Sequence, residues 1–140
     1  LKHAYSIKDT ATILQELGYT NISIDSSSNQ IQVSGGNRYV PDIIANFDAN
    51  KKTYWEVELA HHKDGDFFEK LQKAAKVTDT IYIIAPDKPT FDKLKNQVGR
   101  YRADLIKKGL KTQLTIFIGT MNHLKKREIF SNAECRVKIG

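Results

Sequence analysis

Two short apolar runs constrain the fold of this chain most strongly. Residues 81–85 and 114–118 are almost entirely apolar, and polar turn residues border both runs. Such runs are typical of strands that are buried on both faces of a sheet. Between them, residues 91–108 repeat apolar side chains at helical spacing, and Gly109 follows. A strand, a helix and a strand in this order predict two parallel strands joined by a right-handed crossover.

The preceding half of the chain predicts a helix, several strands and a second helix. The first helix is expected to begin at Ser6, which can act as its cap, and to end at Gly18. Short connections between the strands predict an antiparallel meander; the expected strands cover residues 22–24, 31–33, 39–47 and 53–60. We therefore expect a single α/β domain over residues 1–140, with a mixed central sheet flanked by helices.

Acidic side chains gather on two of these expected strands. Because strand side chains alternate faces, Glu56 and Glu58 share one face, while Trp55 and Val57 enter the core from the other. Two carboxylates on one face repel each other unless a hard cation or an Arg or Lys side chain lies between them. The alternative is that both glutamates are simply solvated. Asp42 follows a proline on the neighbouring strand, where an interruption can turn its side chain towards Glu56.

Positive charge is concentrated in the second half of the chain. Residues 87–138 contain 13 Lys or Arg and 5 Asp or Glu, whereas the remainder contains 9 and 11. A surface of this kind favours a polyanionic partner, and solvated helix faces are the alternative. The candidates for contact with nucleic-acid phosphates are Arg100, Arg102, Lys107 and Lys108.

The acidic residues also form a recognisable motif. Pro41-Asp42, thirteen intervening residues and Glu56-Val57-Glu58 resemble the signature of the PD-(D/E)xK nuclease superfamily. This superfamily includes many restriction endonucleases and archaeal Holliday-junction resolvases, and its αβββαβ core resembles the element order expected over residues 6–86. The resemblance implies a restriction-endonuclease-like fold and a Mg²⁺-dependent endonuclease that hydrolyses phosphodiester bonds in DNA.

The resemblance also implies roles for individual residues. Asp42, Glu56 and the backbone carbonyl of Val57 would bind Mg²⁺, or Mn²⁺ in its place. The third motif position is usually a lysine that positions or activates the attacking water, but this chain has Glu58 there. Some restriction endonucleases of the superfamily carry glutamate at this position and remain active.

Three interpretations of the third motif position, which Glu58 occupies, remain open. Glu58 acts as a base or an additional metal ligand; a lysine of the following helix, Lys70 or Lys73, takes the usual role; or the site has lost its chemistry. The candidate catalytic residues are Asp42, Glu56, Glu58 and Lys73. A catalytically inactive DNA-binding or assembly module that retains the nuclease fold is the alternative function.

Two other features bear on the site. Some sites of this superfamily include an acid from the first helix, and Glu16 would be the match. His61 and His62 follow the strand directly, and at most one of them can face the acids because adjacent side chains point in opposite directions. We favour a strand-end or DNA-facing role for these histidines over metal binding.

Composition sets expectations for location and partners. A single cysteine, Cys135, excludes an internal disulfide and favours a reducing, cytoplasmic setting. No apolar run reaches the roughly 18–20 residues of a membrane helix, so no membrane association is expected. DNA is the expected partner, and a homodimer is the option that many nucleases of this kind use to cut two strands. The chain lacks an initiating methionine, and we expect it to be part of a longer protein whose other domains would be further partners.

Overall fold

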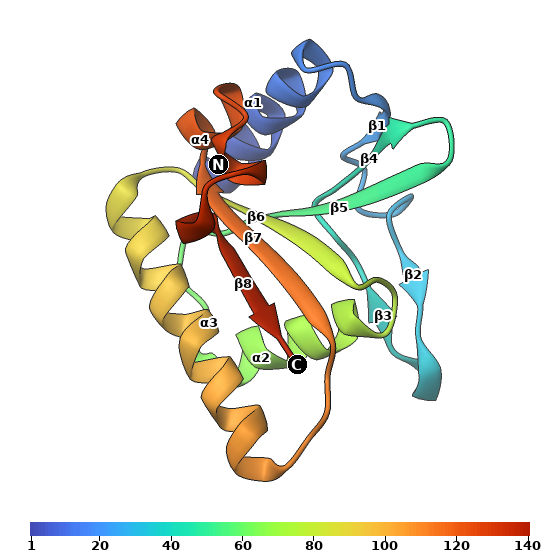
Figure 1. Cartoon of the computed structure of the whole chain (residues 1–140). Helices are drawn as coiled ribbons and strands as arrows, with labels where there is room; N and C mark the ends of the chain where they lie inside the picture. The colour runs from blue at the N-terminus through green and yellow to red at the C-terminus, as the bar shows by residue number, and fades with distance from the viewer.

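The computed structural model describes all 140 residues and shows an α/β fold with a mixed six-stranded sheet flanked by helices (Figure 1). The strands lie in the order β1-β4-β5-β6-β7-β8. Their bounds are β1 (Thr20–Ser23), β4 (Ile43–Asp48), β5 (Lys51–Val57), β6 (Thr80–Ala85), β7 (Leu114–Thr120) and β8 (Arg136–Ile139).

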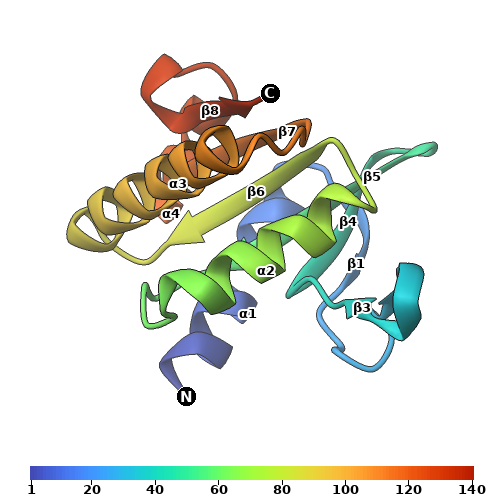
Figure 2. The ribbon, with the colours of Figure 1, turned by 90° about the horizontal axis from the view of Figure 1, so that it is seen from below.

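Helices cover the two faces of the sheet unequally. The helices are α1 (Lys2–Glu16), α2 (Asp64–Ala75), α3 (Lys88–Lys108) and α4 (Met121–Lys125). α2 and α3 run along one face, whereas α1 and the short α4 lie together on the other, towards one end of the sheet (Figure 2). None of the helices combines the length and the apolar character that crossing a membrane requires.

The predicted strand–helix–strand unit is confirmed. β6 and β7 are parallel, with Ile83 opposite Ile118, and α3 connects them. The side chains of both strands that face α3 are buried, but Tyr82, Thr115 and Phe117 on the other face are partly exposed, so the expectation of burial on both faces is wrong for these strands. α3 ends at Gly109 in the left-handed conformation, with φ of 66°, as expected for a glycine after the last turn.

The first helix begins earlier than predicted. α1 starts at Lys2, and Ser6 is a buried residue inside it rather than its cap. The Ser6 carbonyl accepts a hydrogen bond from the Thr10 hydroxyl at 2.8 Å. The serine therefore sits in the first half of the helix, and the extra turn before it brings His3 against the sheet.

The predicted meander is only partly correct, because Pro41 divides the strand expected over residues 39–47. β3 (Arg38–Tyr39) pairs with β2 (Ile31–Gln32) in a separate two-stranded sheet, and β4 starts after the break. β1 pairs with β4, and β4 and β5 form the expected antiparallel hairpin. Proline has no N–H to donate to a ladder, so pairing stops there. Asp42 lies in this break, directly before β4.

Candidate functional site

The acids of the motif meet at the end of β5. Glu56 and Glu58 are each only 2% exposed and face α2, while Trp55 and Val57 are buried from the opposite side. The pairing of β5 with β6 continues one residue beyond the end of β5, because the Glu58 N–H donates to the Ile84 carbonyl of β6 at 3.0 Å. The two glutamates are therefore buried side chains rather than members of a solvated strand face.

Lys70 of α2 supplies the positive charge between them. Its Nζ lies 3.1 Å from Glu56 Oε1 and 2.8 Å from Glu58 Oε1, and its side chain is 27% exposed. Lys73, one turn further along α2, does not reach the acids and instead pairs with Glu69 at 3.3 Å. Of the two lysines considered from the sequence, the structure thus places Lys70 at the site.

The break before β4 holds Asp42 against β5. Asp42 Oδ2 accepts the Val57 N–H at 2.8 Å. The buried Asn29 fixes the break from the other side, because its side-chain amide donates to the carbonyls of Pro41 and Asp42 at 3.2 and 3.3 Å. Asn29 carries no motif signal in the sequence, and only the fold reveals its positioning role.

His3 is a site residue that sequence reasoning missed. Its Nε2 lies 2.9 Å from the Val57 carbonyl oxygen and 3.2 Å from Asp42 Oδ2. A carbonyl oxygen only accepts, so Nε2 carries the proton in this arrangement. Glu16, the helix-one acid considered from the sequence, is exposed at the opposite end of α1. The first helix therefore contributes an imidazole to the site from its first turn.

His62 also approaches the acids, in agreement with the expectation that at most one of the paired histidines would. Its Nε2 lies 3.6 Å from Glu58 Oε2, and the imidazole is about half exposed. His62 and His3 are therefore both at the solvent-facing margin of a cluster whose glutamates are buried.

Glu56 has the most unusual environment of the cluster. Tyr39 donates its phenol proton to Glu56 Oε2 at 2.6 Å. The other oxygen, Oε1, is buried without a hydrogen bond, although Lys70 Nζ lies within ion-pair distance. Burial raises the pKa of Glu56 to about 7, and the negative charge of Asp42 adds to the rise, while Lys70 opposes it.

Lys70 stays protonated in this environment. Burial by itself lowers the pKa of Lys70, but the charges of Glu56 and Glu58 and the hydrogen bond to Glu58 outweigh it and raise the pKa above its usual value. Burial and the adjacent Glu56 likewise raise the pKa of Tyr39, so its phenol remains a donor. At neutral pH the site thus contains one fixed cation and one carboxyl group that titrates near pH 7.

The oxygen atoms of the acid cluster are of the type that binds a hard cation, but they are not arranged as a metal site. Asp42, Glu56 and the Val57 carbonyl are oxygen donors of the type that Mg²⁺ takes, and the Glu56 oxygen without a hydrogen bond is one of them. No group of three or more His, Cys, Asp or Glu side chains is arranged to hold a metal ion. His3 Nε2 already contacts two of the three oxygen donors. These three oxygen donors can bind Mg²⁺ together only if the His3 imidazole moves away from the Val57 carbonyl.

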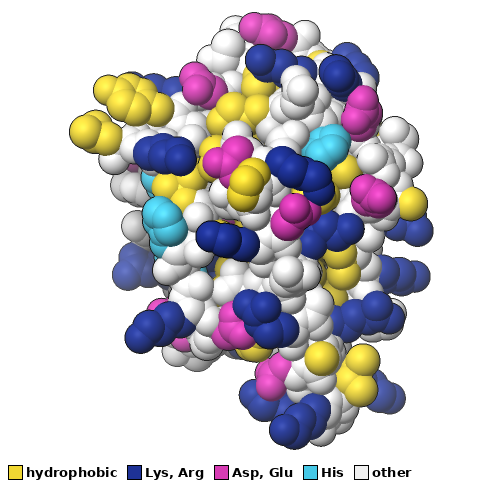
Figure 3. Space-filling model, turned by 90° about the vertical axis from the view of Figure 1, so that its left-hand side faces the viewer, with side chains coloured by type: hydrophobic (Ala, Val, Ile, Leu, Met, Phe, Trp, Pro, Cys, Tyr) yellow, Lys and Arg dark blue, Asp and Glu magenta, His cyan; other side chains and the backbone are white.

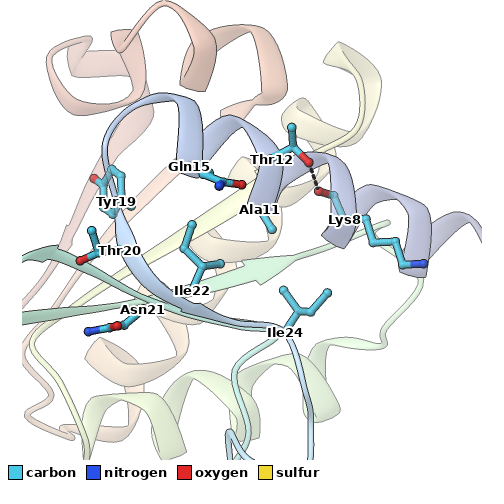
Figure 4. Close-up of a pocket in the computed structure, with 9 residues that line it drawn as sticks. All are labelled: Lys8, Ala11, Thr12, Gln15, Tyr19, Thr20, Asn21, Ile22 and Ile24. Carbon is cyan, nitrogen blue, oxygen red and sulfur yellow. Dashed lines mark hydrogen bonds between the residues drawn. The ribbon is translucent and has the colours of Figure 1, made fainter.

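A small hollow of about 290 Å³ opens beside the cluster. Lys70 and Tyr39 line it together with Arg38, Lys73 and the acids Asp66 and Glu69, so cationic and acidic side chains both face it. A larger hollow of about 720 Å³ lies elsewhere, between α1 and β1 (Figure 4). Lys8 is its only charged lining residue, and Ile22 and Ile24 line its strand side. The larger hollow therefore has no carboxylate, imidazole or thiol that could hold a metal or act as a general base.

The four basic residues predicted to bind nucleic acid lie on more than one side of α3, and only Arg100 and the exposed Lys107, seven positions apart, share a side. Arg100 is held by Asp64 through two hydrogen bonds of 2.8 and 3.0 Å, and Lys108 pairs with Asp104 at 3.0 Å. Arg102 follows Arg100 by two positions, which places it on another side of the helix. Figure 3 shows this face of the molecule with Lys and Arg interleaved with Asp and Glu.

Comparisons with known proteins do not add to this geometry. A scan against protein-family models, a search of curated proteins and a search of solved structures each found no match to the chain.

Proposed function

We propose that this chain is a Mg²⁺-dependent DNA endonuclease domain with a restriction-endonuclease-like core. The observation that carries the proposal is the position of Lys70, whose ammonium lies between Glu56 and Glu58. The motif has glutamate where lysine is usual, and α2 brings a lysine to the same carboxylates from a different part of the chain. The succession of α1, β1, β4, β5, α2 and β6 also supports the proposal, because it follows the αβββαβ order apart from the small β2–β3 sheet.

The roles follow from the contacts. Asp42, Glu56 and the Val57 carbonyl would hold Mg²⁺, which when bound polarises a phosphodiester and lowers the pKa of a coordinated water. Lys70 is protonated and lines the hollow at the cluster, where it can donate to a phosphate oxygen or orient the attacking water. Glu58 fixes the Lys70 ammonium at 2.8 Å and is thereby a positioning residue.

A catalytically inactive DNA-binding or assembly module is the second candidate, and one observation favours it. His3 Nε2 contacts both Asp42 and the Val57 carbonyl, so a protonated nitrogen stands among the atoms that the cation would need. Together with Lys70, His3 gives each acid of the cluster a hydrogen-bonding or ionic partner without a metal.

The two candidates are separated by a cleavage assay on linear, supercoiled and branched DNA with Mg²⁺ or Mn²⁺. The wild-type chain is expected to cut at least one substrate, and Asp42→Asn and Glu56→Gln to reduce the rate by about 10²-fold or more. Asp92→Asn removes an exposed helix carboxylate that pairs with Lys88 and is expected to leave the rate unchanged. The nuclease proposal fails if wild type cuts none of the substrates or if the two site variants cut as fast as wild type.

Metal binding gives a readout that does not depend on cleavage. Binding of Mn²⁺, followed by its electron paramagnetic resonance signal, is expected for wild type and Asp92→Asn and is expected to be lost in Asp42→Asn. If the wild-type chain neither binds Mn²⁺ nor cleaves DNA, the inactive module is the correct function.

A further inference from the structure

The sheet face opposite to α2 and α3 is only partly covered. α1, α4 and the short helix η2 (Glu128–Phe130) pack over one part of it, and an open hollow of about 480 Å³ lies beside them. Aromatic rings and two cations line this hollow: Tyr19, Phe47, Tyr82, Phe130, Lys51 and Arg127. The acid cluster faces α2, on the other side of the sheet, so the hollow is separate from the candidate nuclease site.

A ladder of stacked rings crosses the sheet on this face. Trp55, Tyr82 and Phe117 occupy paired positions on β5, β6 and β7. The ring centroids are 4.3 Å apart for Trp55 and Tyr82 and 5.2 Å for Tyr82 and Phe117, with both pairs tilted by only 16°. Trp55 is fully buried, whereas Tyr82 and Phe117 are partly exposed.

Phe47 extends the aromatic surface to the β4–β5 hairpin. It packs edge-on against Tyr19 at 5.6 Å, yet its side chain is 57% exposed. Phe47 thus places an exposed apolar ring at the rim of the open hollow, next to the partly exposed rings that line it.

Unpaired cations border the rings. Arg136 and Lys138 of β8 pair across the ladder with Phe117 and Thr115, so their side chains emerge on the same face. Like Lys51 and Arg127, they are exposed and take part in no ion pair. This contrasts with Arg100 and Lys108 of α3, which acids already neutralise.

We propose that this face binds single-stranded nucleic acid, with a base stacked on the exposed ring of Phe47 and phosphates held by Lys51, Arg127, Arg136 and Lys138. Single strands offer the faces of their bases, and aromatic side chains beside a positively charged groove recognise them with little sequence preference. A duplex keeps its bases stacked inside and cannot use the rings. A wholly apolar partner would leave the four cations without counterions, and a simple polyanion would have no use for the exposed ring of Phe47.

The proposal is tested by fluorescence anisotropy with labelled oligothymidylate, oligouridylate and duplex DNA of about 15 nucleotides or base pairs. Oligothymidylate is expected to bind more tightly than the duplex, and the uridylate arm reports whether DNA or RNA is preferred. Phe47→Ala is expected to weaken single-strand binding by about fivefold or more. Lys51→Ala and Lys138→Ala are each expected to reduce the slope of log K against log salt by about 0.7.

Lys76→Ala is the matched control, because Lys76 is an exposed lysine at the end of α2, on the opposite face. It is expected to leave both affinity and salt slope unchanged. The proposal is overturned if duplex binds more tightly than the single strand or if Phe47→Ala binds as well as wild type. It is also overturned if Phe47→Ala converts a dimer to a monomer, because the face would then be an interface between two copies of the chain.

Discussion

Replacing Lys70 by methionine is expected to lower the free energy of unfolding by about 3–5 kcal/mol, which is the usual cost of removing one partner from a buried ion pair. Glu56 and Glu58 are each 2% exposed and would be left facing each other without a cation. The loss is expected to be largest at alkaline pH, where Glu56 can no longer escape the repulsion by taking up a proton. Urea denaturation monitored by circular dichroism, in buffer containing EDTA, measures the change.

Lys73→Met provides the control within the same helix. Lys73 pairs with the exposed Glu69, and an exposed pair of this kind contributes less than about 1 kcal/mol. Adding Glu58→Gln to Lys70→Met is expected to recover part of the stability, because one of the two unpaired charges is removed. Equal effects of Lys70→Met and Lys73→Met would show that Lys70 does not compensate buried charge.

The strongest sequence signals located two interior strands of the sheet. The runs over residues 81–85 and 114–118 predicted β6 and β7 correctly, because one face of both strands is buried and the other carries the partly exposed rings of Tyr82 and Phe117. The pairing of the first strands could not be predicted in the same way. β2 and β3 have two residues each, and Pro41 separates β3 from β4, so which strand pairs with which depends on tertiary packing.

The candidate site shows the same limit at the level of single residues. Alternation along residues 53–60 correctly placed Glu56 and Glu58 on one face, since that pattern depends only on strand geometry. The choice between Lys70 and Lys73 depends on how α2 is rotated against β5, which spacing alone does not define. His3 lies 54 residues before Val57, and its contact with the Val57 carbonyl is set by the docking of α1. A histidine in a first helical turn gives no sequence signal for that contact.

The stability of the wild-type chain is expected to carry a component that decreases as pH rises from about 4.5 to about 7. The pKa of Glu56 is raised from 4.5 to about 7, mainly because its carboxyl is buried. Over this interval the native protein retains a proton that the unfolded chain has released, so a higher pH favours unfolding. The shift corresponds to a loss of about 3 kcal/mol across the interval, since one pKa unit is about 1.4 kcal/mol.

Glu56→Gln isolates this component, because glutamine does not titrate while the other ionisable groups of the chain remain. The quantity to measure is the difference in unfolding free energy between wild type and Glu56→Gln at successive pH values, without divalent metals. Asp25, Asp64 and Asp87 have lowered pKa values and titrate below the interval in both proteins. Wild type is expected to lose stability relative to Glu56→Gln as pH rises. A relative gain would mean that Lys70 outweighs burial and that Glu56 is held as a carboxylate, whereas parallel curves would mean that burial leaves its proton affinity unchanged.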